Sequence, residues 1–342
     1  MELKEIYQPI ERELDDVERV LRVSLTSSRS KFILKLGGYL LDIKGKRLRP
    51  ALVILSAKAA LKQRPKAAYG FAYRKANHCS PTYQQLTKIA SAIELIHMAS
   101  LIHDDCLDHA RFRHNKPTIN RKFGQEASIA LGDYLYSIGF ELISSSRNPD
   151  ILSCIASATK AMCEGELIQV CERDNLDLLK KRYIIIAKKK TASLFVASCQ
   201  AGAILFNREA SIQHTLKEYG LNFGIAFQII DDYLDLIGEK KDLGKSPGAD
   251  FKMGELTLPI LNLLTQTKDR NRLISLLKQQ DSPEAFRGLR QRFINSPALL
   301  KTKDDVCFYV REAKKELNRL KDSCFRQSLF NLADYLLNKI TI

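Results

Sequence analysis

Apolar residues recur every three or four positions along most of the chain, which is the spacing of amphipathic helices. The first such stripe, Ile6, Ile10, Leu14, Val17 and Leu21, predicts a helix over residues 1–25, in which Pro9 marks a candidate start. The same spacing predicts helices over residues 31–41, 49–61, 86–108, 127–145, 149–170, 176–205, 211–237 and 258–264, followed by several shorter segments. No segment has a pattern typical of a sheet. The sequence therefore predicts an all-α fold.

Two long stretches lack this helical spacing. Residues 63–85 contain two Pro, one Gly and three Tyr and are expected to form a loop excursion. Residues 238–259 are rich in Gly, Lys and Asp, a composition typical of loops that carry function. With 342 residues, of which 45% are hydrophobic, the chain can bury a large core. We expect a single domain over residues 1–342.

The charge of the chain is unevenly distributed. The formal net charge is +15, and residues 43–93 hold eleven Lys or Arg without any Asp or Glu. Such a block favours an anionic partner, which could be nucleic acid, an anionic membrane surface or a phosphorylated small molecule. A solvated basic face is the alternative that charge alone leaves open.

Nothing in the sequence predicts a membrane span or a metal-binding cysteine motif. No apolar run approaches the roughly 20 residues that cross a bilayer, and the N-terminal segment is too acidic for a signal peptide. The eight cysteines show no CxxC pairing of the kind found in zinc sites. We expect a cytoplasmic protein, or one that touches a membrane only peripherally.

Two identical acidic clusters are the most informative local feature. Asp104, Asp105 and Asp108 end one long apolar helix, and the same DDxxD pattern recurs at Asp231, Asp232 and Asp235. Residues i and i+4 of a helix share a face, so each cluster presents paired carboxylates that repel each other unless a cation neutralises them. One such cluster is usually a solvated helix end, whereas two flanked by apolar helix favour a cation site.

Aspartate clusters favour Mg²⁺ over a pair of iron ions. Mg²⁺ usually takes one or two carboxylates together with water and substrate phosphate. A di-iron bundle needs a Glu-x-x-His pair on each of two helices, and the sequence offers only Glu94 with His97. We therefore expect Mg²⁺ between facing helices.

Basic residues lie close to both clusters in the sequence. The segment GKRLRP contains Lys46, Arg47 and Arg49, and Arg111 and Arg113 follow the first cluster. Lys188 to Lys190 precede Thr191, and Lys245 follows the second cluster. Each is by itself more typical of a surface residue. Two acidic clusters with several basic groups nearby have the composition of a site that binds metal and diphosphate.

Six motifs in this order resemble those of the trans-isoprenyl diphosphate synthases, and of the long-chain polyprenyl synthetases in particular. They are GKRLRP (45–50), the first DDxxD followed by Arg113, GELIQ (165–169), KTASLF (190–195), FQIIDDYLD with the second DDxxD, and LGK (243–245). The resemblance covers roughly residues 30–265. It implies a single helical bundle around a deep central cavity, commonly assembled as a homodimer.

The resemblance also implies roles for individual residues. Mg²⁺, with three ions usual in the family, would be held by residues among Asp104, Asp105, Asp108, Asp231 and Asp235, with Asp104, Asp108 and Asp231 as the principal ligands and Asp232 in support. The diphosphate of the allylic substrate would be held by Arg113, Lys190, Thr191, Gln228 and Lys245. The pocket for isopentenyl diphosphate would contain Lys46, Arg49 and His97.

Two departures from the family pattern concern the substrate pockets. The family usually has Arg-Arg-Gly after the first cluster, where this chain has Arg113, His114 and Asn115. A histidine can still donate a hydrogen bond to phosphate, with a charge that depends on pH, so His114 remains a candidate for the isopentenyl site. Lys44-Gly45 stands where a double glycine is usual.

Small residues before the first cluster predict a long product. Ala99 and Ser100 lie roughly 6 to 7.5 Å below Asp104 along the helix axis, and in short-chain members of the family a bulky aromatic there blocks the growing tail. We therefore expect a long-chain product and expect Ala99→Phe to shorten it. Met98, Tyr136 or Phe140 could instead close the tunnel deeper down.

Other functions fit the sequence less well. A terpene cyclase has no use for GKRLRP, and head-to-head condensing enzymes space their acidic motifs differently. A farnesyl or geranylgeranyl diphosphate synthase, or a non-catalytic subunit of a heteromeric synthase, remains an alternative. Nucleic-acid binding is disfavoured because six carboxylates would repel phosphate unless metal intervened.

Overall fold

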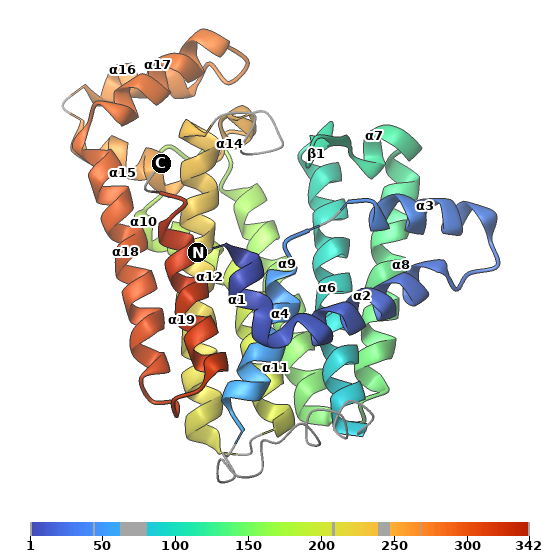
Figure 1. Ribbon diagram of the computed structural model, residues 1–342. Coiled ribbons are helices and arrows are strands. Elements are labelled where there is room, and N and C mark those ends of the chain that lie inside the picture. The colour runs from blue at the N-terminus through green and yellow to red at the C-terminus, as the bar shows by residue number, and fades with distance from the viewer. Residues whose placement is uncertain are drawn as a thin grey trace.

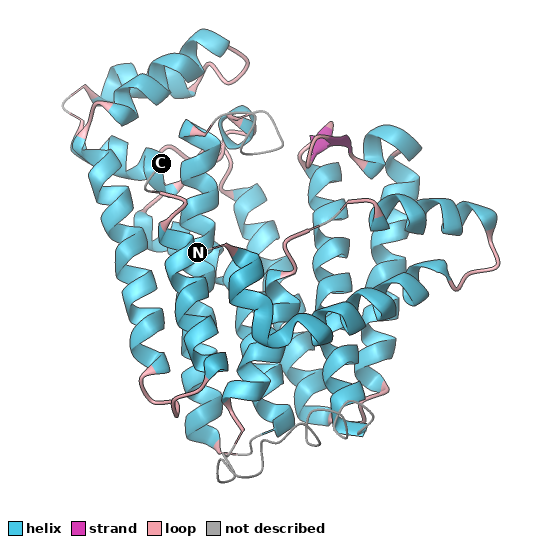
Figure 2. Ribbon diagram, viewed as in Figure 1, coloured by secondary structure: helices cyan, strands magenta, loops and turns pink. Residues whose placement is uncertain are grey.

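The computed structural model describes residues 2–43, 45–61, 81–206, 209–238, 247–267 and 269–340 (Figure 1). These residues form a bundle of helices, and the strands among them are one short antiparallel pair (Figure 2). The predicted all-α fold is confirmed.

The N-terminal region differs from the single helix predicted over residues 1–25. Helix α1 (Leu3–Tyr7) passes into the 3-10 turn η1 (Gln8–Ile10), and α2 (Glu11–Thr26) follows. Pro9 lies in η1, where its missing N–H and fixed φ are compatible with the tighter turn but not with an uninterrupted α-helix. Helix α3 (Lys31–Leu41) has the predicted bounds, and α4 (Leu48–Ala59) begins one residue before its prediction.

Five long helices form the centre of the bundle. They are α6 (Pro81–Leu107), α8 (Gln125–Ser144), α9 (Pro149–Cys171), α11 (Ser193–Phe206) and α12 (Ala210–Ile237). Helix α6 packs against α8, and α11 packs against α4, α9 and α12. At Gly202 an added Cβ would lie 2.3 Å from the carbonyl oxygen of Val53. The backbones of α4 and α11 thus touch at a point where only glycine fits.

The C-terminal helices cover one side of this core. They are α15 (Leu258–Gln266), α16 (Arg270–Leu277), α17 (Pro283–Ile294), α18 (Pro297–Leu317) and α19 (Cys324–Leu337). Ser282 and Ser296 cap α17 and α18, and each is followed by a proline at the first helical position, where a missing N–H costs nothing. Helix α18 packs along α12.

Short elements connect the long helices near the predicted site. They are the strands β1 (Phe112–Arg113) and β2 (Lys116–Pro117), the helices α7 (Ile119–Phe123), α10 (Lys180–Ala187) and α14 (Ala249–Lys252), and the π-helical segment η3 (Lys188–Ala192). The helix predicted over residues 176–205 therefore begins at Lys180 and contains a π-helical segment. The apolar spacing predicts neither the strand pair nor α7.

Part of the excursion predicted over residues 63–85 lies within the described residues. Helix α6 begins at Pro81, so the last five of those residues are helical rather than loop, and residues 62–80 lie outside the described part of the chain. Of the helices in the described part, not one combines the length and the apolar character needed to span a membrane.

Helices α6 and α12 run in the same direction through the bundle, and both end in the upper half of the view in Figure 1, near β1 and α14 respectively. Because each DDxxD cluster lies at the C-terminal end of its helix, the fold brings both clusters to one end of the molecule.

Candidate active site

The first acidic cluster occupies the end of α6. Asp104 and Asp105 belong to its last turn, and the backbone N–H of Asp108 still donates to the carbonyl of Asp104 at 2.9 Å. Asp105 is held by Arg113, whose Nε donates to both carboxylate oxygens at 3.0 and 3.1 Å. Burial raises the pKa of Asp104 to about 7, against the opposing effect of Lys190. Asp104 thus needs nearby cations in order to stay ionised.

A two-residue hairpin places Arg113 beside the cluster. Phe112 and Arg113 of β1 pair with β2, and the turn consists of His114 and Asn115, both at positive φ. Such a turn needs left-handed backbone at both central positions, and His and Asn are among the non-glycine residues that adopt it most readily. The hairpin is fixed to α3 by the Tyr39 hydroxyl, which donates to the Pro117 carbonyl at 2.7 Å.

The second acidic cluster lies in the last two turns of α12. Asp232 is buried, and it accepts hydrogen bonds from the Tyr183 hydroxyl at 2.5 Å and from Gln228 Nε2 at 2.7 Å. Burial raises its pKa to about 7, although both hydrogen bonds oppose that shift. Asp235 is 2% exposed and accepts a hydrogen bond from the backbone N–H of Asp250 at 3.2 Å. Asp231 is the exposed member of the cluster.

The π-helical segment η3 connects the two clusters. Lys190 forms an ion pair with Glu166 of α9 at 2.6 Å, and the charges of Asp104 and Glu166 help to raise the pKa of Lys190 against its burial. The next residue, Thr191, donates a hydrogen bond to Gln228 of α12. Lys190 therefore lies within electrostatic reach of the first cluster, and Thr191 is linked to Asp232 of the second cluster through Gln228.

A close backbone approach holds η3 in this position. An added Cβ at Gly165, in α9, would lie 2.4 Å from the backbone nitrogen of Lys190. Glycine at residue 165 lets η3 lie directly on α9, so that the GELIQ and KTASLF segments are in contact.

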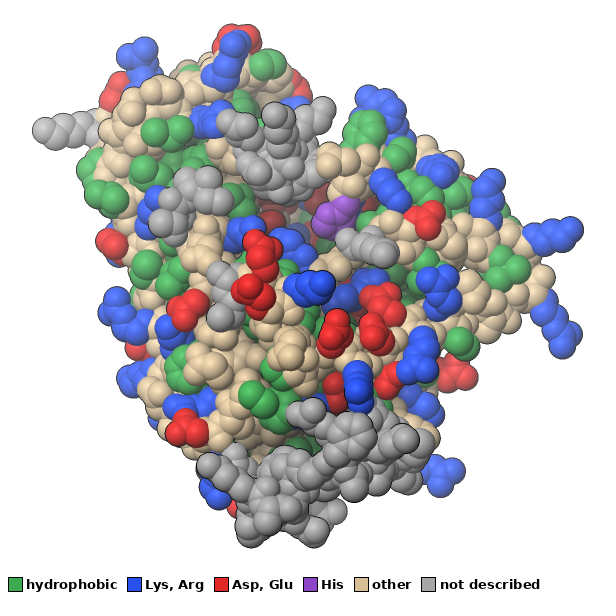
Figure 3. All heavy atoms as spheres, in the orientation of Figure 1, with side chains coloured by type: hydrophobic (Ala, Val, Ile, Leu, Met, Phe, Trp, Pro, Cys, Tyr) green, Lys and Arg blue, Asp and Glu red, His purple; other side chains and the backbone are tan. Residues whose placement is uncertain are grey.

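The charges of Asp105, Asp104 and Asp231 all raise the pKa of Arg113, against the effect of its burial. The guanidinium thus lies within electrostatic reach of both clusters. Acidic and basic side chains gather around a hollow in the upper middle of Figure 3. The structure therefore places near one another eight of the candidate residues: Asp104, Asp105, Arg113, Lys190, Thr191, Gln228, Asp231 and Asp232. Lys245 lies outside the described residues.

A second group of cations lies beside this site, around α4. Arg49 is buried, with its guanidinium carbon 4.4 Å from the centre of the Phe195 ring, and burial lowers its pKa to about 10. Its Nε is buried and has no hydrogen-bond partner among the described residues. Burial, followed by the charges of Arg49 and Arg113, lowers the pKa of His97 well below its usual value. His97 is therefore a neutral imidazole between cations.

The exposed Lys46 belongs to the same group. Burial is the largest cause that lowers the pKa of His114, followed by the charges of Arg113 and Lys46. Glu94, the glutamate of the only Glu-x-x-His pair, instead accepts from Arg47 Nη1 at 2.8 Å. Its role as an ion-pair partner explains that motif without iron.

Four residues at the site were missed in the sequence analysis: Glu166, Tyr183, Arg173 and Glu255. Arg173 Nη2 donates to Asp108 Oδ1 at 3.0 Å and to Glu255 Oε1 at 3.2 Å. Gln169 of the GELIQ segment also donates to Glu255. Glu166 and Gln169 could have been found from their motif, but Arg173 and Glu255 have no periodic or motif signal.

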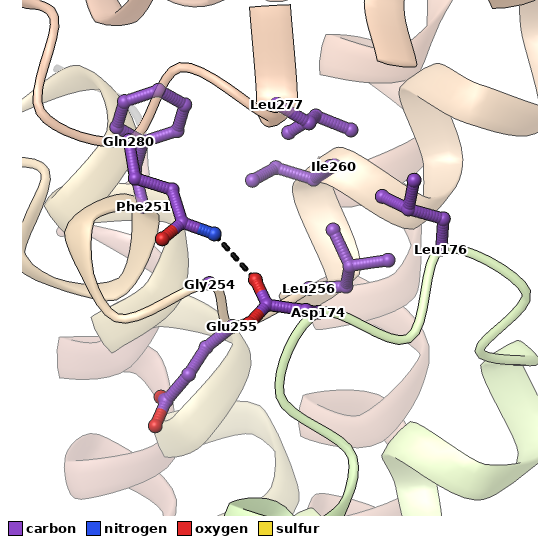
Figure 4. A pocket seen from close by; sticks show the side chains of 9 residues that line it. All are labelled: Asp174, Leu176, Phe251, Gly254, Glu255, Leu256, Ile260, Leu277 and Gln280. Atoms are coloured by element: carbon purple, nitrogen blue, oxygen red, sulfur yellow. Dashed lines mark hydrogen bonds between the residues drawn. The ribbon is translucent and has the colours of Figure 1, made fainter. Parts of the chain in front are cut away.

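Glu255 borders a small cavity between the loop after α9 and the C-terminal helices (Figure 4). Its lining includes Leu256, Ile260 and Leu277, and the Gln280 side chain donates to Asp174 across it. The cavity volume of about 10 Å³ is close to the room that one water molecule needs. This cavity is too small for a substrate.

The two predicted chain-length residues differ in their environment. Ala99 is fully buried, whereas Ser100 is partly exposed and shares a helix face with Asp104, four residues later. The Ser100 hydroxyl donates to the carbonyl of His97 at 2.9 Å. Ser100 is therefore the better placed of the two to border a substrate tail.

The donor set suits Mg²⁺ with an incomplete protein shell. Within the described residues, no three acidic, histidine or cysteine side chains form a ready-made metal cluster. Mg²⁺ commonly uses one or two carboxylates and completes its octahedron with water and substrate phosphate. Separate pairs of carboxylate oxygens, beside cations that would face phosphate, fit this mode of binding.

Comparisons with known proteins agree on one family. A family model described as polyprenyl synthetase matches residues 30–289. A short chain isoprenyl diphosphate synthase of Methanothermobacter thermautotrophicus is 31% identical over 343 residues, which cover 98% of this chain and 99% of that protein. Component 2 of a heptaprenyl diphosphate synthase of Bacillus subtilis is 30% identical, covering 98% of this chain and 90% of that protein.

A solved structure gives the same result for the fold. The crystal structure of a polyprenyl synthase from Caulobacter crescentus, complexed with calcium and isoprenyl diphosphate, superposes with a TM-score of 0.87 at 30% identity. The match covers 98% of this chain and 97% of that chain. The helical bundle is thus shared over nearly its whole length.

Proposed function

The chain belongs to the polyprenyl synthetase family, and from that premise we propose that this prenyltransferase condenses isopentenyl diphosphate head to tail with an allylic diphosphate and releases a long all-trans polyprenyl diphosphate. The main support is the position of η3. Lys190, which pairs with Glu166 of α9, lies within electrostatic reach of Asp104 at the end of α6, and Thr191 is linked to Asp232 of α12 through Gln228. A diphosphate between the two clusters would meet cations from both sides.

The proposed metal ligands are those carboxylates whose protein contacts leave oxygen atoms for a metal. Asp104, Asp108 and Asp231 are the principal candidates, because Asp105 is bonded to Arg113 at both oxygens. Asp105 and Asp235 would play secondary parts, and three ions per site is the family's usual number. Mg²⁺ bound there would neutralise the charge that develops on the departing diphosphate.

Cationic and polar side chains of this site would hold the diphosphate group of the allylic substrate before its bond to the allylic carbon breaks. Lys190 keeps its positive charge because nearby carboxylates raise its pKa, and Arg113 is held rigidly by Asp105. Both cations are therefore fixed in advance where negative charge develops, which is the condition for electrostatic stabilisation of a leaving group. Thr191, Gln228 and Lys245 would complete this pocket.

The isopentenyl diphosphate would bind in the cation group around α4. Arg49 is a buried cation whose Nε has no partner in the described part of the chain, and an anion would satisfy it. His97 is neutral, so it can donate one hydrogen bond without adding charge. Lys46 and His114 lie at the edge of this group and would meet the outer phosphate.

Binding in adjacent pockets would bring the double bond of one substrate to the allylic carbon of the other, and proximity would supply much of the rate. The apolar lengths of the central helices would exclude water, which would otherwise quench the allylic cation to an alcohol. The proton lost after condensation would pass to the released diphosphate, so no side chain is assigned as the base.

Product length is the finer part of the proposal. The small size of Ser100 and Ala99, which precede Asp104 by about one turn, supports a product of about six to ten isoprene units by analogy with the family. A shorter farnesyl or geranylgeranyl product is the alternative, and the relative from Methanothermobacter thermautotrophicus is itself named a short chain synthase.

We also propose that the chain forms a homodimer through α9. One side of this helix exposes an apolar stripe that includes Leu152, Leu167 and Val170, with Leu167 67% exposed. Large exposed apolar side chains in one stripe favour a protein contact. A heteromer is the alternative, since the relative from Bacillus subtilis is named as one component of a synthase. Light scattering of the purified chain gives its mass in solution, which distinguishes a homodimer from a monomer that would assemble only with a different subunit.

The place of the protein in the cell follows from its proposed product. A long polyprenyl chain is nearly insoluble in water, so we propose a cytoplasmic enzyme that contacts membranes peripherally when it releases product. The basic block over residues 43–93 would favour anionic lipid.

Incubation of the chain with labelled isopentenyl diphosphate, each allylic primer and Mg²⁺ tests the function. Chromatography of the dephosphorylated lipids should show long-chain products that need Mg²⁺ and that disappear in Asp104→Asn and Asp231→Asn variants. Products no longer than geranylgeranyl would establish the shorter-chain alternative. No product from any primer would favour a non-catalytic subunit.

A further inference from the structure

Arg173 joins the first acidic cluster to a carboxylate outside both DDxxD motifs. One atom, Arg173 Nη2, is shared between Asp108 at 3.0 Å and Glu255 at 3.2 Å. The side chains of Arg173 and Glu255 are both largely buried, with exposed fractions of 21% and 11%. Asp108 therefore already has a cation at one of its oxygens without any metal.

The surrounding backbone fixes both partners. The N–H of Asp174 donates to the carbonyl of Gly254 at 2.9 Å, so the residues next to Arg173 and Glu255 are bonded to each other. Gly254 has a φ of +70°, and an added Cβ there would lie 2.3 Å from Asp174 Oδ1. Gln280, in the turn between α16 and α17, also donates to Asp174 (Figure 4).

A guanidinium and a metal ion compete for the negative charge of the Asp108 carboxylate. When Mg²⁺ binds this carboxylate, the hold of Asp108 on Arg173 Nη2 weakens, because two cations beside one carboxylate repel each other. A partly buried guanidinium that lost its only anionic partner would be costly. Glu255 removes that cost, since it already accepts from the same nitrogen.

We propose that Arg173 is the resident counter-ion of Asp108 and that Glu255 is the residue that receives it when metal binds, so that this pair sets the metal affinity of the first acidic cluster. Arg173 and Glu255 are positioning residues in this scheme, because they act through Asp108. This inference rests on the metal site proposed above.

The scheme predicts effects of opposite sign for the two partners. Arg173→Gln removes the competitor and should tighten metal binding about twofold to fivefold, the upper part of the range expected for one partly exposed ion pair. Glu255→Gln leaves Arg173 with Asp108 alone and should weaken binding by a similar factor. In the Arg173→Gln background, Glu255→Gln should have less than about a twofold effect, because no guanidinium remains to be received.

Metal binding without substrate is the appropriate measurement. Mn²⁺ serves as the probe, and the electron paramagnetic resonance signal of the free ion gives the bound fraction for the full-length chain. Arg182→Gln is the matched control: Arg182 Nε pairs with Glu172 at 2.8 Å close to the same loop but contacts neither cluster. Urea unfolding of the metal-free proteins confirms that every variant is folded.

The outcomes separate this inference from the proposed function. Opposite shifts for the single variants, a silent Glu255→Gln in the double variant and an unchanged control would support the counter-ion pair. Additive effects would show that Arg173 and Glu255 act only as distant charges, and equal or absent shifts would likewise overturn the pair. A wild-type chain that binds no Mn²⁺ would overturn the metal site itself.

Discussion

Replacing Gly165 with alanine should uncouple η3 from α9 and thereby disable the site. Gly165 lies in the middle of α9, and the Cβ of alanine would lie 2.4 Å from Lys190 N, 2.8 Å from Lys190 Cα and 2.9 Å from Lys189 C. All three neighbours are backbone atoms, so no flexible side chain can move aside. Relief requires η3 to shift as a unit.

The size of this shift follows from ordinary contact distances. Carbon atoms pack at about 3.5 to 4.0 Å, so η3 must retreat by about 1 Å. Overpacking of this kind costs about 1–3 kcal/mol, while alanine regains about 1 kcal/mol of helix propensity over glycine. We therefore expect the free energy of unfolding to fall by up to about 2 kcal/mol. A 1 Å displacement of Lys190 and Thr191 should cost about 10²-fold in kcat/KM.

Urea unfolding and a steady-state condensation assay with labelled isopentenyl diphosphate measure the two effects. Gly38→Ala is the matched control, because no atom lies within 4 Å of its added Cβ in α3. That variant should gain about 0.5–1 kcal/mol of stability and keep full activity. If Gly165→Ala retains wild-type stability and turnover, the backbone contact does not hold η3 as described.

Three further predictions concern single side chains. Ser100→Phe should shorten the product, as measured by chromatography of the dephosphorylated lipids. Ala99→Phe should instead lower the stability of the fold, because Ala99 is fully buried. An unchanged product from Ser100→Phe would contradict the proposed position of Ser100 beside the substrate tail. Tyr183→Phe removes the 2.5 Å hydrogen bond to Asp232 and should lower the free energy of unfolding in urea by about 1–3 kcal/mol. The same variant should reduce kcat and leave the KM for isopentenyl diphosphate unaffected. A raised KM with an intact kcat would argue against a role of Tyr183 at the second cluster. Because the pKa of His97 is lowered in the folded chain, the unfolded chain binds a proton below pH 6.5 that the folded chain does not. The free energy of unfolding of the wild type, relative to that of His97→Gln, should therefore fall with decreasing pH by up to about 1.4 kcal/mol per pH unit. Parallel pH profiles of the two proteins in urea unfolding would refute this.

The helices and the acidic clusters are predictable because their signals are local. Apolar spacing predicts α3 with its observed bounds, and the two DDxxD motifs identify the acidic ends of α6 and α12 from the amino-acid sequence alone. The fold class follows from the same spacing, since buried helix faces must repeat every three or four residues.

The finer anatomy of the site depends on contacts between distant residues. Tyr183 and Asp232 are 49 positions apart, and Arg173 and Glu255 are 82 apart. A single charged residue in a loop has no periodic signal, so its partner cannot be inferred from spacing. The π-helical segment η3 likewise lies against Gly165, a contact that a helical pattern over residues 176–205 does not reveal.

The common direction of α6 and α12 has an electrostatic consequence. The backbone dipoles of a helix sum to a partial negative charge at its C-terminus, and both acidic clusters lie at such ends. The peptide groups of two helices thus add their negative potential to that of the aspartates. The main chain would therefore attract a cation as well as the side chains, and a bound ion would reduce the repulsion between like charges at both helix ends. Occupancy by a divalent ion should therefore stabilise the whole bundle as well as the site.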